Sequence, residues 1–122
     1  MQRPVLPTFA FVPAMLLLTS SFAAAAPPHL AASTPVAEAI LDGRNQQFVV
    51  RFDAPIDHAA ARLAIVRNGN VVERLHPLLD SAPDVLFASA SALAPGHYTL
   101  HWHVGAASGG DVAEGDIPFT VR

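Results

Sequence analysis

Alternation of apolar and polar residues dominates this sequence and predicts that the folded part is an all-β sandwich. The clearest run covers residues 97–104, where every second residue is apolar. A second signal is Asn68-Gly69, which stands between two short alternating runs and is typical of a tight hairpin turn. A third is that turn residues recur at short intervals, with no long amphipathic helical pattern. Together these features indicate an immunoglobulin-like Greek-key β-sandwich of about seven strands.

The strand over residues 97–104 is expected to cross the middle of the core. Strand side chains point alternately to opposite faces. The apolar face holds the chain's only Trp and only Tyr, and consists of Tyr98, Leu100, Trp102 and Val104. The polar face holds three of the six histidines, and consists of His97, Thr99, His101 and His103. Because large aromatic side chains dominate core energetics, we expect the first face to be buried. The residues that open the strand, Pro95-Gly96-His97-Tyr98, have the form of a tyrosine corner.

Ahead of this strand, the chain predicts an edge strand, a core strand and one helical turn. Residues 30–35 are extended, because Pro35 forces its predecessor out of the helical region. Residues 47–53 alternate and should point three large apolar side chains inward, namely Phe48, Val50 and Phe52. One helical turn is expected near Asp57, whose side chain would cap it.

The remaining strands include a hairpin. Residues 62–67 and 70–75 should pair around Asn68-Gly69, because a type I′ turn needs positive φ at both central positions. Residues 84–88 predict a further short strand, and residues 115–121 predict the last one. Pro118 cannot donate a hydrogen bond, so the last strand should have an unpaired side or a bulge there.

Residues 1–25 have the pattern of a secretory signal peptide. A short front with Arg3 is followed by an apolar run and then by small residues. We expect cleavage after Ala25, which makes residues 26–122 the exported domain and predicts a periplasmic location. The alternative is an uncleaved membrane anchor, but the apolar run is short and is interrupted by Pro7 and Pro13. No lipid anchor is evident.

The composition narrows the classes of function. The chain has no cysteine, so thiol chemistry is excluded and an exported domain must be stabilised by packing. The formal net charge is −3, which argues against nucleic acid as a partner. The sequence holds no Gly-x-Ser-x-Gly nucleophile elbow and no phosphate-binding loop, and we therefore expect no enzyme.

Several short motifs resemble those of the CopC copper-resistance family. They stand at the start, middle and end of the exported domain: His29-Leu30, Ser33 and Pro35; Leu93, Pro95, Gly96, Tyr98, Leu100 and Trp102; Gly115, Phe119 and Val121. The resemblance covers nearly the whole exported domain. It implies a β-sandwich that binds copper in the periplasm, with a membrane copper transporter as a possible partner.

The family's Cu(II) site, as the resemblance implies, combines an N-terminal histidine with an Asp-x-His after the Trp strand. That histidine binds through both its amine and its ring. His29 matches it here, but Pro27 and Pro28 precede it and displace the amino group from the ring. The loop after Val104 contains no histidine, and Asp111 could supply one oxygen ligand. The exported domain has no methionine, which favours Cu(II) over Cu(I).

His101 and His103 offer a substitute pair of ligands. On one strand face their Cα atoms would lie about 6.6 Å apart, close enough for both rings to reach one ion. One hypothesis is a site of His29 with Asp111, and a second is a site of His101 with His103. We favour a mixed site of His29 with the strand pair, because a carboxylate replaces a lost imidazole poorly at Cu(II). Ordinary solvent-facing histidines remain the alternative for the strand pair.

The sequence therefore predicts a periplasmic carrier or buffer for Cu(II), with an atypical, weakened site. A different class stays open, in which the sandwich no longer binds metal and recognises a protein partner through an edge strand. The loss of the family's Asp-x-His supports that reading. A copper monooxygenase would need a histidine as the first mature residue, and Pro27-Pro28 argue against it.

Overall fold

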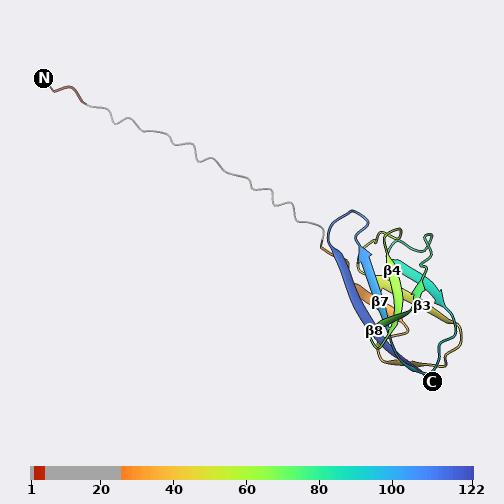
Figure 1. Cartoon of the computed structure of the whole chain (residues 1–122). Coiled ribbons are helices and arrows are strands. Elements are labelled where there is room, and N and C mark those ends of the chain that lie inside the picture. Colours follow the sequence, from red (N-terminus) through yellow and green to blue (C-terminus); the bar gives the residue numbers. More distant parts are fainter. Residues whose placement is uncertain (1, 5–25) are drawn as a thin grey trace.

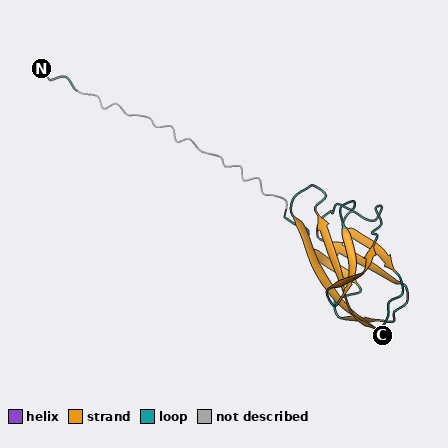
Figure 2. Ribbon diagram, in the orientation of Figure 1, coloured by secondary structure: helices purple, strands orange, loops and turns teal. Residues whose placement is uncertain are grey.

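Strands make up all the regular structure in the part of the chain that the computed structural model describes, residues 2–4 and 26–122 (Figures 1 and 2). They are β1 (Leu30–Thr34), β2 (Ala39–Leu41), β3 (Gln46–Phe52), β4 (Arg62–Arg67), β5 (Asn70–Leu75), β6 (Val85–Ala90), β7 (Gly96–Gly105) and β8 (Val112–Val121). The predicted all-β sandwich is thus confirmed. Alternation missed only the short β2. The predicted signal peptide falls on residues outside the described ranges, apart from 2–4. Within the described ranges, no helix has the length and apolar character needed to cross a membrane.

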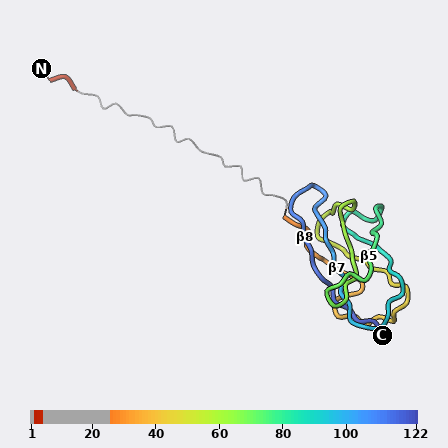
Figure 3. Tube along the Cα trace, in the orientation of Figure 1, coloured from red at the N-terminus to blue at the C-terminus, as the bar shows by residue number. Residues whose placement is uncertain are grey.

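The strands form two sheets, which Figure 3 follows along the chain. The smaller sheet has the order β1-β3-β6, and the larger has the order β2-β8-β7-β4-β5. β1 is an edge strand that pairs antiparallel with β3, as its sequence predicts. β7 lies between β8 and β4, which places the Trp strand in the interior of the larger sheet.

The core lies between the sheets and is built by the inward faces that alternation predicts. Phe48, Val50 and Phe52 of β3 are buried, as are Tyr98, Leu100 and Trp102 of β7. The rings of Phe52 and Trp102 meet edge to face with centroids 5.1 Å apart, which joins the two sheets. Since these side chains face inward, the residues between them must face outward.

Two predicted turns are confirmed in detail. Asn68 and Gly69 have φ angles of 51° and 76°, as a type I′ hairpin between β4 and β5 requires. The Tyr98 hydroxyl donates a hydrogen bond to the Ala94 carbonyl at 2.5 Å, which is the contact of a tyrosine corner. This bond fixes the chain where it enters β7.

Pro118 stands where β8 has one unpaired side. Its carbonyl accepts from the Glu38 N–H at 2.7 Å, and parallel pairing with β2 begins at the next residue, Phe119 opposite Ala39. The N–H and C=O of one strand residue point to the same side. The position without an N–H therefore faces the end of β2 rather than β7, as the sequence predicts.

The helical turn predicted near Asp57 is wrong. Residues 58–60 form a turn, in which the Asp57 carboxylate accepts from the Ala59 N–H at 3.1 Å. The side chain thus caps as expected, but no helix follows. β4 already begins at Arg62, and the turn closes only through a bond from the Ala61 N–H to the His58 carbonyl at 3.4 Å, so no helical hydrogen bonding follows.

Candidate metal centre

The segment that leads into β1 and the loop after β7 are tied to the same stretch of chain. The Asp53 N–H donates to the His29 carbonyl at 2.9 Å, and the Ala107 N–H donates to the Pro55 carbonyl at 3.1 Å. These bonds lie at the end of the sandwich where β3 finishes and β8 begins. The residues that resemble the family's N-terminal histidine and its loop ligand therefore belong to one end of the molecule.

His29 contacts a carboxylate through two of its nitrogen atoms. Its backbone N–H donates to Asp53 Oδ1 at 2.7 Å, and its ring Nδ1 lies 3.0 Å from Asp53 Oδ2. Both side chains are well exposed, at 70% for His29 and 49% for Asp53. Sequence reasoning placed Asp53 only on the outward face of a strand and missed it as the partner of His29.

This contact shifts the acidity of Asp53. The backbone N–H of His29 has the largest effect and lowers the pKa of the Asp53 carboxyl below its ordinary value of 3.8. Desolvation is the second-largest effect and raises the pKa, while the ring of His29 lowers it further through its hydrogen bond and its charge. Asp53 is therefore an ionised acceptor at neutral pH.

The nitrogen atoms of His29 do not match the chelate that the family resemblance implies. The backbone nitrogen is a peptide N–H, because Pro28 precedes it and is fully buried. The two nitrogens that would coordinate copper in the family arrangement, the backbone nitrogen and Nδ1, contact the Asp53 carboxylate instead. A metal could reach His29 through the free Nε2 of its ring, or through Nδ1 if it displaced the hydrogen bond.

The four predicted ligands do not form one cluster. Asp111 is exposed in the loop just before β8. His101 and His103 lie on the outer face of the larger sheet, whereas His29 lies at the start of β1 in the smaller sheet. Within residues 2–4 and 26–122, no group of three or more His, Cys, Asp or Glu side chains is placed to hold one ion. The mixed site of His29 with the strand pair is not assembled in this structure.

The two strand histidines differ in their surroundings. His101 Nδ1 lies 2.8 Å from Asp116 Oδ1, and its Nε2 lies 3.4 Å from Glu114 Oε2. His103 has a buried Nδ1 without a hydrogen-bond partner. Neither Glu114 nor Asp116 was among the ligands that the sequence predicted.

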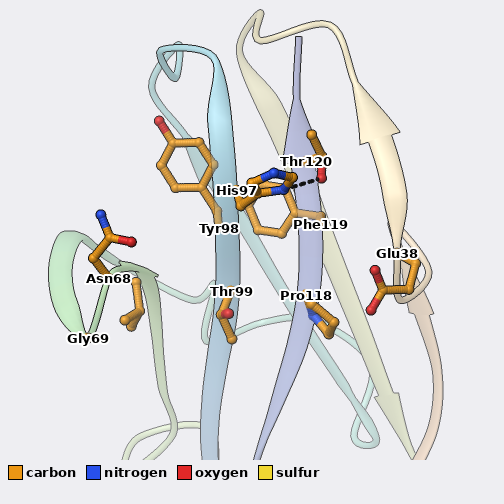
Figure 4. A pocket seen from close by; sticks show the side chains of 10 residues that line it. Glu38, Asn68, Gly69, His97, Tyr98, Thr99, Pro118, Phe119 and Thr120 are labelled. Atoms are coloured by element: carbon orange, nitrogen blue, oxygen red, sulfur yellow. Dashed lines mark hydrogen bonds between the residues drawn. The ribbon is translucent and has the colours of Figure 1, made fainter.

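Hollows lined by described residues lie on the outer face of the larger sheet, and two of them contain histidines. The larger has a volume of about 550 Å³ and is lined by His101, His103 and Glu114, together with Arg62 and Arg74. The smaller, of about 260 Å³, lies near the β4–β5 hairpin tip, where Figure 4 shows His97 bonded to Thr120. Its lining contains one histidine and one carboxylate, Glu38, so it offers no larger set of metal ligands.

Comparison with known proteins is consistent with this fold. The family model described as CopC domain matches residues 30–122. The crystal structure of CopC from Methylosinus trichosporium OB3b is 25% identical with a TM-score of 0.68, over 78% of this chain and 93% of that one. The structure of PcoC, a methionine-rich copper resistance protein from Escherichia coli, is 20% identical with a TM-score of 0.61, over 80% of this chain and 100% of that one. No curated protein matches the chain. From its fold, its motifs and the family match, the chain belongs to the CopC domain family.

Proposed function

We propose that this CopC-family protein is a periplasmic carrier or buffer for Cu(II), with a weakened site centred on His29, and that it is not an enzyme. The observation that carries the proposal is the contact of His29 with Asp53 at the start of the family domain. Imidazole nitrogen and carboxylate oxygen are donors that suit Cu(II). The solved relatives named above, CopC and a copper resistance protein, support the choice of metal.

Asp53 would act as the positioning residue of this site. A ligating histidine usually donates its second ring N–H to a carboxylate, which fixes the ring and makes the ligating nitrogen more basic. Asp53 contacts Nδ1 in this way, which leaves the exposed Nε2 of His29 to bind Cu(II). Asp111, from the loop at the same end of the sandwich, would supply an oxygen.

The site should be weak and easily exchanged. It lacks the amine nitrogen and the loop histidine of the family arrangement, and its side chains are exposed. A carrier that releases copper to a membrane transporter would need such exchange. Because neutral imidazole is the form that binds metal, the affinity for Cu(II) should fall when the solution is acidified.

The test is a Cu(II) titration of the exported protein and four variants, with a competing chelator to report free copper. His29→Ala should weaken binding by about tenfold or more, and Asp53→Asn by about 10- to 100-fold if it positions the ring. Asp111→Ala should also weaken binding. His97→Ala is the matched control, since His97 is exposed, bonds Thr120 and lies away from this end. Unchanged affinity in all variants would refute the site.

A second candidate function is that of an interaction module that binds no metal. Two observations favour it: the described residues hold no three-ligand group, and β5 is an edge strand with Val71 and Val72 exposed. An edge strand of this kind can pair with an extended partner segment. The same titration decides between the two, because an exported protein that binds no Cu(II) would favour the module.

A further inference from the structure

A second histidine–carboxylate cluster lies on the outer face of the larger sheet, away from His29. We propose that it is a shallow binding site for a divalent ion of the Zn(II) type. His101 and Glu114 would be the ligands, and Asp116 would be the positioning residue. This inference stands independently of the proposed Cu(II) function, because it shares no residue with the His29 site.

The pairing of β7 with β8 brings these three side chains together. His101 lies opposite Asp116, and His103 lies opposite Glu114. Trp102, between the histidines, is buried in the core, so both histidines face outward with the carboxylates of β8. The cluster is therefore set by sheet register rather than by a loop.

The contacts of His101 leave one ring nitrogen ready to bind a cation. Nδ1 lies 2.8 Å from Asp116, so the ring proton of the neutral form belongs there and Nε2 carries the lone pair. Nε2 lies 3.4 Å from Glu114 Oε2. Two acceptor atoms this close repel each other unless a proton or a metal ion is bound between them.

The separation of 3.4 Å suits a metal better than a proton. Charge-assisted hydrogen bonds between nitrogen and oxygen are usually about 2.7–2.9 Å long. Two ligand atoms on a tetrahedral Zn(II), each bonded at about 2.1 Å, stand about 3.4 Å apart. Nε2 of His101 and Oε2 of Glu114 thus have the spacing of two neighbouring zinc ligands.

His103 is the next histidine on the same face, but no carboxylate is bonded to its Nδ1 as Asp116 is to that of His101. Its Nδ1 is buried without a hydrogen-bond partner. Binding a metal through Nε2 would require a proton on that Nδ1, where no acceptor is placed to hold it, whereas Asp116 holds the proton on Nδ1 of His101. We therefore assign the site to His101 and not to the pair of histidines.

An ion can reach the site, and only two protein ligands hold it. His101 and Glu114 line the hollow of about 550 Å³, and their side chains are 38% and 64% exposed. With no third ligand placed among the described residues, water would complete the coordination shell.

Arg62 and Arg74 line the same hollow, and their positive charges repel a cation. Arg62 is the nearer of the two, because it lies opposite His103 on the neighbouring strand, whereas the strand of Arg74 is the next one out. Their positive charge lowers the affinity for a cation, so the site should be weak.

The experiment is a Zn(II) titration of the exported protein by calorimetry, repeated with Co(II) because its absorption reports tetrahedral coordination. His101→Ala should weaken binding by about tenfold or more, and Asp116→Asn by about 10- to 100-fold. His103→Ala is the matched control on the same strand face and should retain the affinity. His29→Ala should also retain it, whatever that variant does to Cu(II).

Two results would overturn the proposal. One is that the unmodified protein binds no Zn(II), in which case the cluster is an ion pair closed by a proton. The other is that His103→Ala weakens binding as much as His101→Ala, which would return the site to the histidine pair. As an independent check on the location of the site, the ring signals of His101 in an NMR spectrum should shift with added Zn(II) while those of His97 stay in place.

Discussion

Whether a histidine of this protein can bind a further ligand depends on the partners of its two ring nitrogens. His29 and His101 each have a carboxylate at Nδ1, from Asp53 and Asp116, which leaves Nε2 for another ligand. His58 differs, because its Nε2 contacts the Val85 carbonyl at 2.8 Å and is thereby occupied. The residue type alone does not separate these cases, since the partner atom sets the tautomer.

The His29–Asp53 contact should make stability depend on pH in the acid range. The folded-state pKa of Asp53 is lowered below 3.8, mainly by the His29 backbone N–H. A lowered pKa means that the stabilisation is fully present above the unfolded value and is lost as pH falls through the folded value. Exported protein should therefore unfold at a higher temperature than Asp53→Asn at neutral pH, with a difference that shrinks below about pH 4.

The measurement is thermal unfolding of both proteins from pH 7 to pH 2.5. Asp111→Asn is the control, because the Asp111 carboxylate has no hydrogen-bond or ion-pair partner among the described residues. Its unfolding temperature should follow that of the exported protein throughout. A constant gap between the exported protein and Asp53→Asn down to the lowest pH would contradict the role of the contact.

At the level of strands, the sequence predicted the features that depend on neighbouring residues alone, namely the inward faces of strands and the hairpin turn. Alternation fixes which side chains of β3 and β7 enter the core, and Asn68-Gly69 fixes its own turn geometry. β2 could not be predicted in this way, because three residues are too short to show a period and its pairing with β8 is parallel and distant in sequence. The helical turn near Asp57 was mispredicted for a similar reason, because β4 begins at Arg62 through its pairing with the distant β7.

The candidate sites could be predicted only in part, because they depend on pairings between distant residues. Asp53 lies 24 residues after His29, and nothing in the local pattern joins them. Asp116 and Glu114 reach His101 through the register of β7 with β8. That register could have been found only if the strand ends around the 106–111 loop had been known.

The same register explains one glycine of β8. Gly115 lies opposite Trp102, and a Cβ added there would stand 2.5 Å from an atom of the indole ring. Gly115→Ala should therefore displace the ring and lower the free energy of unfolding by about 1–3 kcal/mol. Urea unfolding followed by Trp fluorescence would measure both the loss and the change around the indole.

Gly105 provides the matched control for this prediction. It ends β7, has no positive φ, and an added Cβ would meet its nearest atom, on Val112, at 3.7 Å, an ordinary contact. Gly105→Ala should leave the free energy of unfolding unchanged or raise it by up to about 1 kcal/mol, because alanine lowers the conformational entropy of the unfolded chain. Equal losses in both variants would mean that crowding against Trp102 is not the cause.

For the whole molecule, the position of the first residue decides which site can form. Pro28 is fully buried and the chain is continuous through it into His29, so the backbone nitrogen of His29 is a peptide nitrogen as long as Pro28 is present. The family arrangement needs a free amine at that position. If copper binds at His29, the residue at which the chain begins therefore decides whether an amine nitrogen is available to it.

The small residues that precede Pro27 predict where processing occurs. Intact mass of the exported protein should correspond to a chain that starts at Ala26 or a few alanines earlier. A mass that retains Met1 would contradict both the signal peptide and the periplasmic location. A mass that corresponds to a chain beginning at His29 would contradict the weakened site, because the α-amine of His29 would then be available as a ligand.

A chain produced to begin at His29 should bind Cu(II) more tightly than the chain that begins at Ala26. Its amine and Nδ1 could then grip one ion together, and a second ligand on the same residue acts at a high effective concentration. We expect an affinity gain of about tenfold or more in a chelator competition. The matched control carries one alanine added before His29, which restores the peptide bond and lacks Pro28 equally. Equal affinity in these two chains would show that the missing amine is not what weakens the site.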